Sequence, residues 1–189
     1  MSVRFDIGAA LRSARQAELL PGALERVQQR ATSTLSRRLK AEAGRAVPAR
    51  FNVAPKLVRD RLRVVNEGRG VVALIGSGDP LELQHFGGEY GGRLTPGATA
   101  QILVGGERRV RRGSFVRKSD GSRGQIVSRA NSRRDIGQRV QRLPIKTEYG
   151  PDVGSMLLSG QVGSELAQFG SRILADEVAR LVAVELKGL

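Results

Sequence analysis

Residues 108–142 read RRVRRGSFVRKSDGSRGQIVSRANSRRDIGQRVQR. This stretch contains twelve basic residues and only two acidic ones, so it holds most of the formal charge of +14 that the chain carries at pH 7. Within it, residues 113–117 and 125–129 contain β-branched and aromatic side chains, and the turn-forming sequence SDGSR lies between them. The pattern predicts a basic β-hairpin followed by a basic arm over residues 130–142.

The sequence on either side of this stretch predicts helices and further strands. Apolar residues at helical spacing indicate a helix over residues 5–19 and a longer one from residue 23 to residue 43, ended by Gly and Pro at 44–48. A short helix is expected at 55–62. Strands are expected at 63–66, 70–75 and 99–104, and the apolar spacing of residues 162–182 predicts a closing helix with excess acidic charge.

This order of elements predicts an α+β fold, with a small, mostly antiparallel β-sheet, N-terminal helices and a C-terminal helix. A chain of 189 residues fits a single domain, which we expect to span residues 1–189. Its three consecutive parts are the N-terminal helices (1–48), the central sheet with the basic hairpin and arm (49–150), and the C-terminal helical segment (151–189).

The composition argues against an enzyme. There is no cysteine, which excludes disulfides, thiolate metal ligands and cysteine nucleophiles. The one histidine, His85, is insufficient for a zinc site, and we expect it to be a partly buried hydrogen-bonding side chain. The glycine-rich segments at 76–80 and 87–92 lack the pattern of a phosphate-binding loop. We therefore expect no catalytic residue, no cofactor, no metal and no small-molecule substrate.

Membrane association is also not expected. The apolar runs are too short to span a bilayer, and the first residues lack the apolar core of a signal peptide. The basic helix at 23–43 has no aromatic anchors on its apolar face, so we interpret it as a helix that packs on the protein and not on a lipid surface. The sequence predicts a soluble protein.

A sequence pI near 11.5 makes a polyanion or an acidic protein surface the natural partner. Only one aromatic residue, Phe115, lies within the basic stretch, which argues against base stacking and sequence-specific recognition. Contact with a DNA backbone, contact with acidic subunits, and a merely solvated basic face all remain open. The candidate interface residues are Arg108, Arg109, Arg111, Arg112, Arg117, Lys118, Arg133, Arg134, Arg139 and Arg142.

Several short motifs in a fixed order resemble the minor tail protein Z family of tailed bacteriophages and, more loosely, the tail-completion proteins of long-tailed phages. They are PLEL at 80–83 with Phe86, GSFV at 113–116, VSR at 127–129, RLPI at 142–145 and GPDV at 150–153, and the resemblance covers most of residues 20–160. The motif residues to which the resemblance gives a structural role are Phe86, Gly113, Phe115, Arg129, Pro144, Ile145, Gly150 and Pro151.

The resemblance implies a structural virion protein, assembled in the host cytoplasm, that forms a homo-oligomeric ring, expected to be sixfold. Such a ring would act at the head-proximal end of the tail or at the neck, in tail completion, head-tail joining and DNA passage. Its partners would be other tail or neck proteins and packaged DNA, touched through the DNA backbone. A tail terminator, a head-closure ring protein and an independent nucleic-acid-binding protein without sequence specificity are the alternatives.

Overall fold

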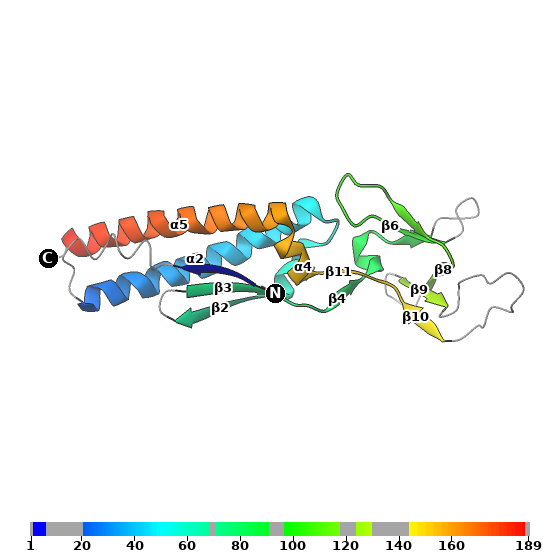
Figure 1. Cartoon of the computed structure of the whole chain (residues 1–189), viewed down its shortest axis with the longest axis horizontal. Coiled ribbons are helices and arrows are strands. Elements are labelled where there is room, and N and C mark those ends of the chain that lie inside the picture. Colours follow the sequence, from blue (N-terminus) through cyan, green and yellow to red (C-terminus); the bar gives the residue numbers. More distant parts are fainter. Residues whose placement is uncertain are drawn as a thin grey trace, which may run out of the picture. The chain divides into compact units, whose positions relative to one another are not determined.

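The computed structural model describes residues 2–6, 21–68, 71–90, 97–117, 124–129 and 144–187 (Figure 1). Long helices and small antiparallel sheets make up these residues, so the α+β prediction is confirmed. The helices are α2 (Pro21–Arg50), α3 (Pro55–Asp60), α4 (Val153–Leu158), α5 (Gly160–Lys187) and the 3₁₀ helix η1 (Leu83–Phe86). The strands are β1 (Ser2–Asp6), β2 (Leu62–Gly68), β3 (Val71–Gly76), β4 (Pro80–Glu82), β5 (Glu89–Tyr90), β6 (Ala98–Ala100), β7 (Arg109–Arg111), β8 (Ser114–Arg117), β9 (Gln125–Arg129), β10 (Ile145–Thr147) and β11 (Tyr149–Asp152).

The chain divides into two compact units, where the sequence predicts one domain in three consecutive parts. Unit 1 comprises Met1–Val47, Pro55–Gly78 and Val153–Leu189, and unit 2 comprises Pro48–Ala54 and Asp79–Asp152. The expected central segment is therefore shared between the units. The physical reason is packing: β3 contacts α4 and β1 contacts α5, which groups these strands with the helices.

Unit 1 is built on two long helices that lie side by side (Figure 1). The start of α2 meets the end of α5, where Arg26 and Glu185 form an ion pair of 2.7 Å, so the two helices run antiparallel. Each helix buries one stripe of small and aliphatic side chains at helical spacing. The buried stripe of α2 is Ala23, Val27, Ala31, Leu35, Leu39, Ala43 and Val47; that of α5 is Val162, Leu166, Gly170, Leu174, Val178 and Leu181.

The sheet of unit 1 has the order β1-β3-β2, and both pairings are antiparallel. The predicted strand pair at 63–66 and 70–75 is confirmed as β2 and β3. The prediction of a helix over residues 5–19 is wrong for Phe5 and Asp6. They belong to β1 (Ser2–Asp6), which pairs with β3 in the register Val3↔Leu74. Pairing with a strand some seventy residues away overrides the local helical spacing. The remainder of that predicted helix, residues 7–19, lies outside the described residues.

The long helix α2 does not end at 44–48 as its Gly and Pro signals predict; it continues to Arg50. Gly44 is buried, and a Cβ atom at this position would lie 2.7 Å from Cγ of Arg59. Glycine at this position therefore allows close approach to Arg59 and does not cap the helix. Pro48 lies in the last turn, where a proline removes only one backbone hydrogen bond from the end of the helix.

Unit 2 consists of three small antiparallel sheets, β11-β4, β5-β6-β7 and β10-β9-β8. Backbone groups join them: Leu83 N–H donates to the Glu148 carbonyl (3.0 Å), and Glu148 N–H donates to the Ile126 carbonyl (2.9 Å). The predicted basic hairpin is confirmed as β8 and β9, in the register Phe115↔Val127. The arm at 130–142 lies outside the described residues.

The strand expected at 99–104 is wrong beyond residue 100, because β6 ends at Ala100. Residues 101–106 instead form a turn that is tied to the end of α2. Asn52 N–H donates to the Ile102 carbonyl (2.9 Å), and Val104 N–H donates to the Arg50 carbonyl (2.8 Å). Between these two bonds, Phe51 and Leu103 form an isolated antiparallel β-bridge.

Candidate functional site

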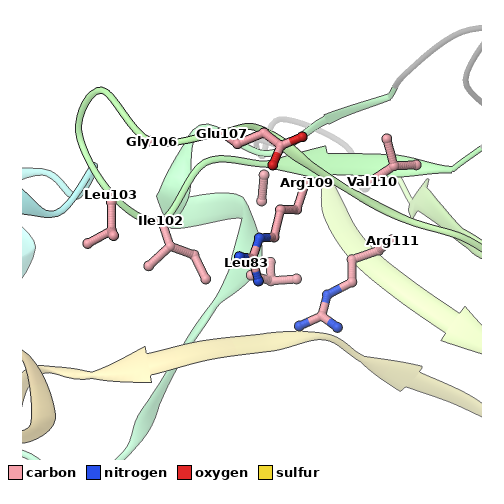
Figure 2. Close-up of a pocket in the computed structure, with 9 residues that line it drawn as sticks. Leu83, Ile102, Leu103, Gly106, Glu107, Arg109, Val110 and Arg111 are labelled. Atoms are coloured by element: carbon pink, nitrogen blue, oxygen red, sulfur yellow. The ribbon is translucent and has the colours of Figure 1, made fainter.

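The alternation of side chains along β7 shapes a concave site in unit 2. Successive side chains of a strand point to opposite faces, and Figure 2 shows Arg109 and Arg111 extending from one side of β7 and Val110 from the other. Two glycines allow the backbone conformation on either side of this strand. A Cβ atom at Gly97 would lie 2.5 Å from the Arg111 carbonyl oxygen, and Gly113 turns the chain into β8 with a φ of 78°, which favours glycine.

A cavity of about 370 Å³ lies between β7, the turn at 101–106 and η1 (Figure 2). Its apolar lining includes the buried Leu83 and Ala100 together with the half-buried Ile102. Leu103, half exposed at the turn, lines the opening. The described residues that line it are Leu83, Ala100, Ile102, Leu103, Gly106, Glu107, Arg109, Val110 and Arg111. The site therefore combines an apolar surface with a charged rim.

The rim carries more positive than negative charge. Arg109 and Arg111 are exposed, and within the described part of the chain neither guanidinium is hydrogen-bonded or paired with a carboxylate. Glu107 is the one acid among the lining residues. An anionic group that enters the cavity would find two guanidinium groups that can donate hydrogen bonds to it.

Arg108, although predicted as an interface residue, has a structural position. Its guanidinium donates to the Gly87 carbonyl (2.9 Å) and to the hydroxyl of Thr99 (3.0 Å), and it lies 3.5 Å from the Glu89 carboxylate. These contacts connect the end of η1 with β5 and β6. Its Nη1 group is therefore engaged within the chain.

The structure brings together only two of the ten predicted interface residues, Arg109 and Arg111, at the cavity. Arg112 and Arg117 are exposed, in the turn after β7 and at the end of β8, and do not line it. The other predicted residues, Lys118, Arg133, Arg134, Arg139 and Arg142, lie outside the described residues. The apolar half of the site was not predicted, because Leu83, Ala100 and Ile102 meet β7 only in the folded chain.

The motif residues of the resemblance lie in unit 2. Phe86 is fully buried, and a Cβ atom at Gly150 would lie 2.6 Å from its ring. Arg129 and Ile145 are paired in the β9–β10 ladder. Gly113 provides the turn between β7 and β8, Phe115 is half-buried in β8, Pro144 is exposed, and Pro151 is half-buried in β11.

A second polar cluster lies on unit 1, where α2 and α5 meet. Glu177 accepts hydrogen bonds from Arg180 (2.8 Å) and from the Thr34 hydroxyl (3.2 Å). The bond from Arg180 is the main cause that lowers the pKa of the Glu177 carboxyl, and the bond from Arg26 likewise lowers the pKa of Glu185. The acidic charge of α5 is thus partly matched by basic residues of the same chain.

The sequence also raised the questions of a role for His85, a metal site and a membrane-spanning helix. His85 is half-buried within η1. The described residues include no group of three or more His, Cys, Asp or Glu side chains arranged to hold a metal ion. No helix in the described part is long and apolar enough to cross a membrane.

The geometry thus defines a class: a small α+β protein with a basic, apolar-lined surface cavity on one unit. Comparison of the chain with family models, with curated proteins and with solved structures finds no match.

Proposed function

We propose that this chain is a structural virion protein: a ring-forming subunit at the head-proximal end of a bacteriophage tail that serves tail completion, head-tail joining and DNA passage. Tail termination and head closure are alternatives within the same class, since each uses a small ring-forming subunit. The location of the ring in the particle distinguishes the three.

One observation carries the proposal: motifs that are far apart in the sequence contact one another in unit 2. Phe86, from the first motif, packs against Gly150, from the last, although sixty-four positions separate them. Arg129 pairs with Ile145 across β9 and β10. These contacts bring the motifs together in unit 2. They support treating the motifs as one structural pattern, and the resemblance supplies the function.

The surface of unit 2 is also suited to assembly. Exposed aliphatic side chains at Leu103, Val104 and Val110 adjoin the exposed Arg109 and Arg111. A heterologous contact, in which one surface meets a different surface on the next copy, closes into a ring when the rotation between copies permits it. In such a contact, the apolar residues provide surface area to bury, and the charged residues beside them fix the orientation of the two copies.

Size-exclusion chromatography with light scattering tests the ring. We expect a closed species whose mass is a multiple of the 20.4 kDa protomer, six being the expected number, either alone or after addition of tails that lack this protein. Negative-stain images of that species should show rings. A protein that stays monomeric under both conditions would contradict the proposal.

A second candidate function is independent nucleic-acid binding, which the four exposed arginines Arg109, Arg111, Arg112 and Arg117 favour. A salt titration of duplex binding separates the two. If the isolated monomer binds with a steep salt slope that falls when these arginines are neutralised, nucleic-acid binding is favoured. Feeble binding that strengthens only after ring assembly favours the virion protein.

A further inference from the structure

Hydrogen bonds within unit 2 support the walls of the cavity. The Gln101 side-chain amide donates to the Gly106 carbonyl (2.9 Å), and Gly106 N–H donates to the Leu103 carbonyl (3.1 Å), which closes the turn on itself. The two bonds to the end of α2 hold the other side of the turn. A preformed site loses less conformational entropy when it binds a ligand, so an exposed turn held in this way favours binding.

The size and lining of the cavity indicate the kind of group it takes. A volume of about 370 Å³ falls in the range of roughly 300–1,000 Å³ that is usual for ligand sites. Leu83, Ala100 and Ile102 provide contact for an aliphatic side chain, while Arg109 and Arg111 provide donors for a carboxylate. Guanidinium and carboxylate groups match in geometry and form charge-assisted hydrogen bonds.

We propose that this cavity binds a segment of a partner polypeptide that presents a carboxylate next to an aliphatic side chain. Charge complementarity supports this occupant, because the rim has two arginines with no partner in the described part of the chain and a single acid, Glu107. The inference concerns the cavity alone and does not depend on the virion function proposed above.

Two features favour a polypeptide over a nucleic acid. None of the nine lining residues is aromatic, so the cavity offers no surface on which a base could stack. The aliphatic lining would also contribute nothing to contacts with a phosphate backbone. A glutamate or aspartate flanked by leucine or valine uses both halves of the cavity.

The test is a titration of the full-length chain, labelled at its Leu and Val methyl groups, followed by NMR. The probe is the tripeptide acetyl-Leu-Glu-Leu-amide, and its control is acetyl-Leu-Gln-Leu-amide, which has nearly the same shape but no charge. We expect saturable shifts of the methyl signals of Leu83 and Leu103 with the Glu peptide. The Gln peptide should bind at least about tenfold more weakly, since it loses charge-assisted hydrogen bonds.

Variants assign the effect to the two arginines. The double variant Arg109→Gln/Arg111→Gln should weaken binding of the Glu peptide by at least about tenfold. The matched control is Arg112→Gln, an exposed arginine next to β7 that does not line the cavity, with an expected change under about twofold. Thermal unfolding of each variant checks that the fold is retained.

Three results would overturn the proposal. The first is the absence of saturable shifts at these methyl groups. The second is equal binding of the Glu and Gln peptides, which would make the charge irrelevant. The third is a 20-base-pair duplex that shifts the same methyl groups more strongly than the peptide does and in an Arg109- and Arg111-dependent way, which would assign the cavity to nucleic acid.

Discussion

At the scale of single residues, the core of unit 2 depends on a glycine that allows an aromatic ring to approach the backbone. A Cβ atom at Gly150 would lie 2.6 Å from Cε2 of the fully buried Phe86. Replacing Gly150 by Ala should therefore displace the ring and lower the free energy of unfolding by about 1–3 kcal/mol, the usual cost of overpacking a core. Urea denaturation at pH 7 measures it.

The control for this substitution is Gly78→Ala, because a Cβ atom at Gly78 meets nothing within 4 Å. Its effect should stay within about 0.5 kcal/mol, as is usual for surface changes. Equal destabilisation by both substitutions would contradict the prediction that a Cβ atom at position 150 displaces the Phe86 ring.

Some arginines of the basic stretch should stabilise the fold, whereas others should contribute little to its stability. Arg108→Gln should lower the free energy of unfolding by roughly 1–2 kcal/mol, since it removes hydrogen bonds to Gly87 and Thr99 and a net hydrogen bond is worth about 0.5–1.5 kcal/mol. Arg112→Gln removes the same charge from an exposed turn and should be nearly neutral. Thermal unfolding of both proteins decides the matter, and identical midpoints would contradict the structural role of Arg108.

Charge made part of the candidate site predictable. The density of arginines in the sequence predicted Arg109 and Arg111 as interface residues, and it predicted Arg108 equally. Only the side-chain contacts of Arg108 show that it has a structural role and not an interface role. Leu83 and Ala100 carry no local signal of a binding site. They line the cavity because η1 and β6 lie next to β7 in the folded chain. No short sequence pattern predicts a contact between segments that are separated along the chain.

At the scale of elements, the contact between α2 and α5 gives unit 1 a pH dependence. Hydrogen bonds from Arg180 and Arg26 lower the pKa values of Glu177 and Glu185 in the folded state. A lowered pKa means that the folded state holds the proton less tightly than the unfolded chain, where the pKa of Glu is about 4.3. The stabilisation is therefore full above pH 4.3 and is lost as the pH falls through the folded-state values.

Replacing Glu177 by Gln tests this dependence. We expect the free energy of unfolding at pH 7 to fall by no more than about 1 kcal/mol, because solvent-accessible ion pairs contribute little. The variant should also lose less stability than the original protein between pH 7 and pH 3. Denaturant titrations at the two pH values measure both effects, with Glu25→Gln, an exposed acid of α2, as control. An unchanged pH dependence would contradict the assigned pairing.

Elements with strong periodicity were predictable, and those fixed by distant partners were not. The apolar spacing of residues 23–43 and 162–182 marks α2 and α5, whose buried stripes follow it. Residues 5 and 6 open the predicted helical pattern of 5–19, yet they belong to β1, which pairs with the edge of β3. Likewise, residues 101–104 have the composition of a strand, but bonds to Arg50 and Asn52 shape them into a turn.

At the scale of the whole molecule, the exposed aliphatic residues beside the basic cavity should govern assembly. Val110 in unit 2 is the test position, and Val65 in unit 1 is its control. The two valines are equally exposed, by 39% and 40% respectively. Val110→Glu should disrupt the ring, because it puts a charge into an apolar contact, whereas Val65→Glu should leave the oligomer intact. Light scattering at equal protein concentration compares the two. Disruption by Val65→Glu alone would place the contact on another surface.

The position of the chain in an intact phage particle tests the central claim most directly. A cryo-electron microscopy map of the neck and upper tail should contain a ring of this chain at the head-proximal end of the tail, and particles that lack the protein should show incomplete tails or unjoined heads. Purified, infectious particles in which mass spectrometry finds no trace of the chain would contradict the proposal that it is a structural virion protein.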